Sequence, residues 1–256
     1  MKAEDVKEHW ESGAPTTKCE TIKRLEVNAI YNAIMDIEGK VGSVLEVGCG
    51  NGENLRNLQA FIPRSFFEGY GNTRFCGMDM VEREPEFDGE FRVGNVLGIS
   101  EVFDEKFDVI FTCRCLISLA NHAEQMKAVG EMAECLNDGG TLIILENFTM
   151  YHTRQNHLRT LLGLKKREAP EYNVFMDDGK LIKHAKSIGL SYKSAYHFAS
   201  LHDIVLYVLL PAMGIEPAYE HELVKAVTKL SLGVEETCPF GTEGQNVLLA
   251  FTKGER

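Results

Sequence analysis

The sequence lacks the segments that mark secreted and membrane-spanning proteins. Residues 1–5 are charged and contain neither the apolar core nor the small-residue cleavage site of a secretory signal. The longest apolar run, residues 204–210, stops at Pro211 and is too short to span a bilayer. We therefore expect a cytoplasmic protein without a membrane span.

The sequence also lacks a cysteine framework. Its seven cysteines are an odd number, and their spacing matches neither a zinc site nor a set of disulfides. Scattered cysteines of this kind are typical of reduced, mostly buried thiols. We therefore expect no bound metal.

Positive charge is scarce as well. Lys and Arg number 27 against 38 Asp and Glu, which gives a formal net charge of −11. An acidic chain is repelled by phosphate backbones, so no nucleic-acid partner is expected. No repeat or low-complexity linker interrupts the 256 residues, and 44% of them are hydrophobic, which favours one packed domain. We expect the protein to be either a monomer or a homodimer.

Residues 44–52 are the most informative part of the chain. An apolar run typical of a buried strand leads into three alternate glycines, Gly48, Gly50 and Gly52, and then into a helix-forming segment. Glycine tolerates positive φ and lets a ligand approach the main chain, and a helix N-terminus offers free N–H groups. The pattern therefore indicates a cofactor that carries a nucleoside.

The same residues argue against a dinucleotide. A pyrophosphate requires Gly-x-Gly-x-x-Gly, but here the third glycine comes one position early and Glu53 occupies its place. Glu46 adds a second carboxylate before the first glycine. A cofactor with a positive charge and an ammonium group suits this turn better. An NAD-dependent oxidoreductase is the alternative from another enzyme class, and a non-catalytic cofactor-binding protein is a third possibility.

The order acidic-x-Gly-x-Gly-x-Gly resembles motif I of the class I S-adenosylmethionine-dependent methyltransferases. Further pieces match that family in the right order across about residues 40–150. They are residues 74–79, which end in an aspartate, the turn 94–97, the strand and turn 107–119, and the Gly-Gly turn and strand 136–146. The resemblance implies S-adenosylmethionine as cofactor and S-adenosylhomocysteine as product.

The resemblance also assigns roles to individual residues. Glu46 is expected to bind the amino end of the cofactor, and the glycine turn is expected to approach it closely with its backbone. Asp79 is expected to bind the ribose, and Asn95 is expected to contact the adenine. The residues implied are Glu46, Gly48, Gly50, Asn51, Gly52, Asp79, Met80, Asn95, Val96 and Cys113.

The alternation of strands and helices from residue 43 to 149 predicts an α/β fold. We expect a doubly wound, seven-stranded, mostly parallel sheet of the Rossmann-like methyltransferase type, with ligands at the carboxyl ends of the strands. Segments 191–198 and 246–251 are expected to pair antiparallel at the sheet edge.

We expect these elements to form a single domain, 1–256. Its parts are an N-terminal helical arm or lid (1–40), a cofactor-binding core (41–149), and an acceptor roof with the C-terminal strands (150–256). A helix is predicted over 17–38, and helical insertions over parts of 148–181 and about 202–232. Trp10, Arg24 and Glu26 are candidates for closing the arm over the cofactor.

Methyl transfer requires alignment of acceptor, carbon and sulfur, and an oxygen acceptor also requires a base. Glu146, at the end of the fifth predicted strand, is the first candidate, followed by His152 and His157 in the roof. His197 and His202 are further histidines that could reach the site. Arg114 is either a binding group for an anionic acceptor or one half of a salt bridge.

A basic cluster stands out against the acidic chain. It consists of Arg154, Arg159, Lys165, Lys166 and Arg167. If these side chains bind phosphate or carboxylate, the acceptor is anionic; if they form an exposed helix face, they carry no information about it.

A finer resemblance concerns residues 112–119, Glu146, 172–178, 198–200 and 208–212. Together they look like a bacterial group of methyltransferases found with surface-polysaccharide and small-metabolite pathways. The expected reaction is methyl transfer to a small polar acceptor, namely an oxygen of a sugar or of a phosphorylated metabolite. The alternative is N-methylation of a small amine or amino sugar.

Overall fold

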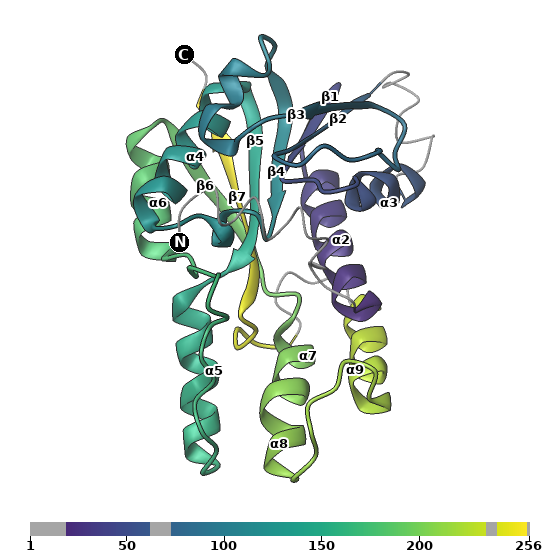
Figure 1. Ribbon diagram of the computed structural model, residues 1–256, viewed down its shortest axis with the longest axis vertical. Helices are drawn as coiled ribbons and strands as arrows, with labels where there is room; N and C mark the ends of the chain where they lie inside the picture. Colours follow the sequence, from purple (N-terminus) through teal and green to yellow (C-terminus); the bar gives the residue numbers. More distant parts are fainter. Residues whose placement is uncertain (1–18, 62–72, 234–239, 255–256) are drawn as a thin grey trace.

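Seven strands form one sheet in the order β3-β2-β1-β4-β5-β7-β6. The computed structural model describes residues 19–61, 73–233 and 240–254 (Figure 1). The first five strands run parallel, and β7 is antiparallel to both β5 and β6. The strands are β1 (Ser43–Val47), β2 (Arg74–Asp79), β3 (Glu90–Val93), β4 (Phe107–Cys113), β5 (Leu136–Asn147), β6 (Leu190–Tyr196) and β7 (Asn246–Lys253). The predicted sheet and its antiparallel edge are confirmed.

Helices cover both faces of the sheet. Successive strand residues point to opposite faces, so Leu45 packs with α4 and α6 while its neighbour Val44 packs with α2 and α3. On β4, Ile110 packs with α4 and α6, and its neighbour Val109 packs with α2 and α3. The helices are α2 (Glu20–Met35), α3 (Glu53–Phe61), α4 (His122–Glu134) and α6 (Asp178–Ser187). This two-sided cover confirms the doubly wound architecture.

The remaining helices project beyond the carboxyl ends of the strands. Figure 1 shows α5, α7, α8 and α9 extending below the sheet, on the side where β5 continues into α5. They are α5 (Thr149–Leu161), α7 (Ser200–Ile204), α8 (Leu210–Ala212) and α9 (Glu222–Leu232), with a π-helical turn, Val205–Leu209, between α7 and α8. We call this group of elements, residues 148–177 and 200–232, the roof.

Two predicted boundaries change. The helix predicted over 17–38 is α2, and the helical stretch predicted over 202–232 is divided by the non-helical residues 213–221. Gly214 has φ +74°, the left-handed conformation that commonly follows a helix end, so α8 stops there.

Residues 62–72 and the segment with Trp10 lie outside the described residues. Within the described ranges, no helix is long and apolar enough to cross a membrane.

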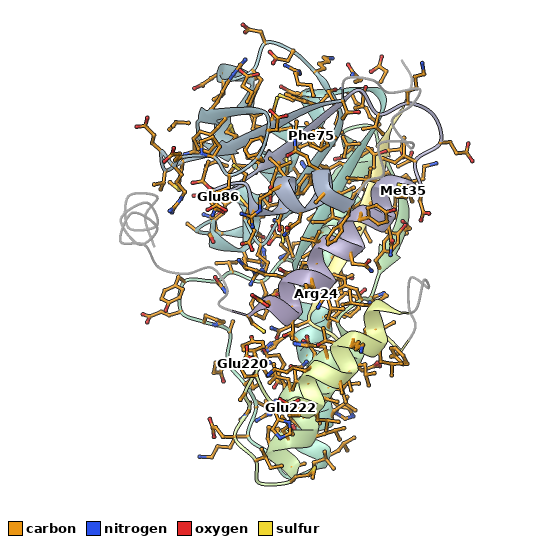
Figure 2. The ribbon with its side chains drawn as sticks, turned by 90° about the vertical axis from the view of Figure 1, so that its right-hand side faces the viewer. Arg24, Met35, Phe75, Glu86, Glu220 and Glu222 are labelled. Carbon is orange, nitrogen blue, oxygen red and sulfur yellow. The ribbon has the colours of Figure 1, made fainter. Side chains whose placement is uncertain are left out.

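The helix α2 joins the sheet to the roof. Figure 2 shows it between Arg24 and Met35 in front of the strands, with α9 beneath it. Its apolar residues Val27, Ile30 and Ile34 pack on the sheet, whereas Cys19, Ile22 and Leu25 pack with Ala199 at the start of α7. The start of α2 therefore lies at the carboxyl edge of the sheet, where a ligand is expected.

Candidate cofactor and acceptor site

A cavity of about 260 Å³ opens at the carboxyl ends of β1, β2, β4 and β5. Its wall contains every residue that the sequence predicted for cofactor binding except Gly52. Those residues are Glu46, Gly48, Gly50, Asn51, Asp79, Met80, Asn95, Val96 and Cys113. The remaining wall comes mainly from α2, the start of α3, the turn after β4, the end of β5 and the separate residues Arg83, Glu124 and Asn173.

The glycine turn after β1 is fixed by its backbone. The N–H groups of Gly48 and Cys49 both donate to the carbonyl of Met78, at 2.7 and 3.0 Å. Gly48 has φ +73°, and a Cβ at this position would overlap Sγ of Cys115. The turn therefore needs glycine both for its conformation and for its close packing against the turn after β4.

Gly52 lies in a different environment from Gly48. Its φ is +81°, and a Cβ there would overlap the ring of Phe87 instead of entering the cavity. Gly52 allows Phe87 to pack beneath the turn. The third glycine thus shapes the turn without lining the ligand space.

Glu46 has an unsatisfied carboxylate oxygen. The side chain is buried, and Nδ2 of Asn54 donates to Oε1 at 2.7 Å, while Oε2 has no hydrogen-bond partner. Burial raises the pKa of this carboxyl to about 8. An ammonium group in the cavity would satisfy Oε2 and favour the ionised form.

Asp79 is held at the end of β2 by two backbone groups. Its Oδ2 accepts from the N–H of Gly50 at 2.8 Å, and its Oδ1 accepts from that of Val81 at 2.9 Å. Each oxygen keeps a lone pair, so the carboxylate can still accept from the two hydroxyls of a ribose. Asn95 caps the 3₁₀ helix η1 (Val96–Glu101), because its Oδ1 accepts from the N–H of Leu97 at 2.9 Å.

The cavity wall near β4 and β5 contains an ion pair. Nε of Arg114, in the turn after β4, lies 2.9 Å from Oε1 of Glu26 on α2. On the same helix, Lys23 pairs with Glu53 at the start of α3. Asn147, which ends β5, is 7% exposed, and its Oδ1 has no partner within the described structure.

Glu146 lies outside this cavity wall. Its side chain is fully buried and accepts hydrogen bonds from Thr112 Oγ1 at 3.2 Å and from the N–H groups of Cys115 and Leu116 at 2.9 and 2.8 Å. Burial raises the pKa of its carboxyl to about 7, and these hydrogen bonds oppose that rise. Glu146 therefore anchors the turn that follows β4.

The two predicted roof histidines lie on α5 and do not line the cavity either. The ring of His152 packs edge-on against Phe175, with 5.1 Å between ring centroids, and His157 is exposed. The structure therefore does not bring Glu146, His152 and His157 together. Their catalytic roles stay predictions.

The basic cluster also lies away from the cavity wall. Three of its arginines contact the protein itself: Arg154 donates to Thr242, Arg159 to the carbonyls of Lys165 and Tyr207, and Arg167 to Gln155. Lys165 and Lys166 are exposed. The arginines therefore tie α5 to the rest of the roof.

Sequence reasoning named two residues of the cavity wall without their contact and missed a third. Arg114 was named as an anion-binding group or one half of a salt bridge, and Glu26 as a candidate for closing the arm, but nothing in the sequence pairs them across 88 positions. Asn147 follows directly after Glu146. Its place at the end of a predicted strand was the one feature of the sequence that could have indicated a wall residue.

Comparison with known proteins decides the family. A family model described as a methyltransferase domain matches residues 19–187, which is more than half of the chain. The chain belongs to the class I S-adenosylmethionine-dependent methyltransferases. This membership confirms the family predicted from the sequence and places the enzyme outside the NAD-dependent oxidoreductases. No curated protein sequence matches the chain.

Solved methyltransferases share the fold of this methyltransferase. The N-methyltransferase NodS from Bradyrhizobium japonicum, in complex with S-adenosylhomocysteine, is 12% identical, with a TM-score of 0.53 and coverage of 98% of both chains. A Clostridium acetobutylicum S-adenosylmethionine-dependent methyltransferase is 11% identical, with a TM-score of 0.55 and coverage of 91% of this chain and 92% of its own. The magnesium protoporphyrin IX methyltransferase from Synechocystis, with bound S-adenosylhomocysteine, is 12% identical, with a TM-score of 0.53 and coverage of 96% and 94%.

Proposed function

We propose that the enzyme binds S-adenosylmethionine in the cavity and transfers its methyl group to a small polar acceptor, an oxygen of a sugar or a related metabolite. The observation that carries this proposal is a single cavity that combines the glycine turn, the unpartnered oxygen of Glu46 and the fixed carboxylate of Asp79. These groups are complementary to an ammonium and a ribose, which the cofactor presents together.

The cofactor, when bound, supplies a methyl group on a sulfonium, so the chain mainly has to bind and orient. Glu46 would accept from the ammonium, and Asp79 from the ribose hydroxyls. Met80, Asn95 and Val96 would contact the adenine. Glu146 would hold the main chain of residues 113–117 against the methionine portion through the hydrogen bonds it accepts.

The charge of the cavity wall bears on the acceptor. Among the described residues, five carboxylates line it against three cationic side chains, and Lys23 and Arg114 are each paired with one of those carboxylates. The basic cluster contacts other parts of the roof. A neutral hydroxyl is therefore better supported as acceptor than a phosphorylated metabolite or another anion.

A small amine is the second candidate. No histidine or tyrosine of the described chain lines the cavity, and the excess of carboxylates suits a cationic substrate. An amine needs only to lose its proton before it attacks, whereas a hydroxyl needs a base during the reaction. Both candidates are small molecules that fit a cavity of this size.

Calorimetric titration with S-adenosylhomocysteine tests the cofactor site. Asp79→Ala should weaken binding by about 1–3 kcal/mol, roughly 5- to 150-fold, because buried hydrogen-bonding groups lose their partner. The exposed Asp104→Ala serves as the matched control and should bind like the unaltered enzyme. Unchanged affinity in Asp79→Ala would contradict the ribose assignment.

A turnover assay tests the acceptor class. S-adenosylhomocysteine formation is measured with equal panels of neutral sugars, sugar phosphates and small amines. We expect turnover with neutral sugars and none with their phosphates. Turnover confined to amines would support the second candidate, and turnover confined to phosphates would contradict both.

A further inference from the structure

The acceptor is expected at the end of the cavity formed by β4 and β5, an expectation that rests on the proposed function. In the sheet order β3-β2-β1-β4-β5, the assigned cofactor residues lie at or after the ends of β3, β2, β1 and β4. The ends of β4 and β5 contribute Arg114 and Asn147, and α2 covers them with Glu26. These three side chains belong to the part of the wall that the cofactor assignment leaves over, which also includes Asn173 and residues 117–120.

Glu26 is 1% exposed, yet it belongs to the cavity wall. Its partner Arg114 has φ +55°, the left-handed conformation, and is the only described non-glycine residue with positive φ. Such strained backbone is costly and concentrates at functional sites, where surrounding contacts maintain it. Here the residue with the strained backbone carries the guanidinium that forms an ion pair with the Glu26 carboxylate.

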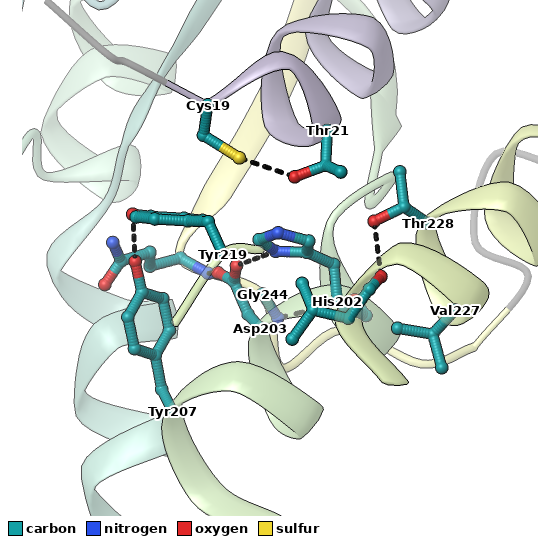
Figure 3. A network of polar contacts seen from close by, with 12 residues as sticks. Cys19, Thr21, His202, Asp203, Tyr207, Tyr219, Val227, Thr228 and Gly244 are labelled. Atoms are coloured by element: carbon teal, nitrogen blue, oxygen red, sulfur yellow. Dashed lines mark hydrogen bonds and ion pairs between the residues drawn. The ribbon is translucent and has the colours of Figure 1, made fainter. Parts of the chain in front are cut away.

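A polar network of the roof is drawn in Figure 3, and two of its residues, His202 and Asp203, act electrostatically on Glu26. Nδ1 of His202 is 2.9 Å from Oδ1 of Asp203, and Oδ2 of Asp203 accepts from the N–H of Gln245 at 2.9 Å. The ring of His202 stacks on that of Tyr219 with 6.0 Å between centroids. Figure 3 shows His202 between Asp203 and the first turn of α2, where Cys19 and Thr21 lie.

The charges around Glu26 come from three elements. Burial raises the pKa of its carboxyl, and Arg114 opposes this rise most strongly. Lys23 on its own helix and His202 on α7 also lower the pKa, whereas Asp203 raises it. A carboxyl with a raised pKa is a better proton acceptor near neutral pH than an ordinary glutamate.

The other titratable groups of the wall are already engaged. Glu46 and Asp79 face the cofactor, Glu53 pairs with Lys23, and Glu124 accepts from the N–H of Ala120 and from Asn121 near the start of α4. Burial raises the pKa of Cys113 and of Cys115 well above the usual range, so neither is a thiolate. Glu26 is the carboxylate of the described wall that lies at the end formed by β4 and β5, where it pairs with Arg114.

We propose that Glu26 is the catalytic base of the transfer and that Asn147 binds the acceptor beside it. The acceptor's lone pair forms the new bond to the methyl carbon, the carbon–sulfur bond breaks, and its electron pair stays on sulfur. The acceptor's proton passes to the carboxylate of Glu26. The unpartnered Oδ1 of Asn147 accepts a hydrogen bond from a neighbouring O–H or N–H of the acceptor.

An infrared titration tests the position of Glu26 without an acceptor. Carboxyl bands are recorded against pH for the unaltered enzyme and for Glu26→Gln, each saturated first with S-adenosylhomocysteine and then with sinefungin. Subtracting the variant removes the bands of Glu46 and Glu146. The Glu26 band should titrate about one pH unit lower with sinefungin, because that analogue carries an ammonium where the transferred methyl sits.

Three outcomes are separable. A Glu26 midpoint that is equal with both ligands would overturn the proposal, as would the absence of a Glu26 band. Failure of the unaltered enzyme to bind S-adenosylhomocysteine would overturn the proposed function instead. If Glu26→Gln does not fold because Arg114 loses its carboxylate partner, the double variant Glu26→Gln/Arg114→Gln, which buries no lone charge, is the partner for subtraction.

Kinetics with an acceptor found in the panel gives the second readout. Glu26→Gln should lower kcat about 100-fold or more, with S-adenosylhomocysteine affinity retained. Glu26→Asp should recover part of the rate, and Asn147→Ala should raise KM for the acceptor more than it lowers kcat. The exposed Glu20→Gln on the same helix is the matched control. Full activity of Glu26→Gln with an unchanged pH profile would overturn the proposal.

Discussion

The cofactor end of the cavity and the roof are held together in different ways. At the cofactor end, backbone groups make the decisive contacts: the N–H groups of Gly48 and Cys49 bind Met78, and that of Gly50 binds Asp79. In the roof, side chains make the decisive contacts, as His202 does with Asp203. A site built from backbone depends on local conformation, whereas one built from side chains depends on which helices meet.

This difference explains why the two regions tolerate change differently. Gly48 cannot gain a Cβ, because both its φ and its contact with Cys115 forbid one. The roof side chains can be replaced one at a time, at the cost of the contacts each one makes. We therefore expect substitutions at the cofactor end to act on binding, and substitutions in the roof to act on stability.

The largest effect is expected for Gly48→Val. A β-branched residue with positive φ costs about 1–2 kcal/mol, and the overlap with Cys115 adds about 1–3 kcal/mol, so the turn must move. Calorimetry should show at least about 30-fold weaker S-adenosylhomocysteine binding. Gly39→Val is the control, since Gly39 has φ +102° and a Cβ there would meet no atom within 4 Å. Equal losses in both variants would mean that strain alone, and not the close packing, is responsible.

An intermediate effect is expected from pH. The carboxyl of Glu46 has a pKa of about 8, so below that pH it is mostly protonated and must lose its proton before it can accept from an ammonium. The dissociation constant of S-adenosylhomocysteine should therefore fall as pH rises from about 6 to about 8, approaching tenfold per unit. In Glu46→Gln this dependence should disappear. A pH dependence that survives in the variant would assign the titration to another group.

The smallest effect on binding is expected for Asp203→Ala in the roof. The change leaves His202 Nδ1 and the N–H of Gln245 without a partner, which should cost about 1–3 kcal/mol of the free energy of unfolding. Urea denaturation measures that loss. S-adenosylhomocysteine affinity should stay within about twofold, and a larger drop would show that the two regions are coupled through α2.

The core of the fold could be predicted because its signals are local. The run from Val44 to Gly52 contains both a strand and the turn that ends it, and residues 74–79 end at the aspartate that lies beside that turn. Gly52 shows the limit of such reasoning. The glycine pattern predicted three residues at the ligand, but Phe87, which is 35 positions away, occupies the space beside the third.

Distant pairings could not be predicted. Glu146 was expected to face the acceptor because it ends a strand, but its side chain accepts from the backbone of the neighbouring turn, a contact that depends on the path of residues 113–117. The basic cluster was conspicuous in the sequence. Its arginines find partners such as Thr242 and Tyr207 only because the segment before β7 and the π-helical turn lie beside α5.

The sequence by itself determined the strands of the parallel core, the glycine turn and the carboxylates at its two ends, because main-chain conformation depends on the residues next to it. Only the tertiary structure decided which side chains share the proposed acceptor end. Glu26, Arg114 and Asn147 come from three separate elements, and they line one cavity because α2 packs against the sheet at the end of β5.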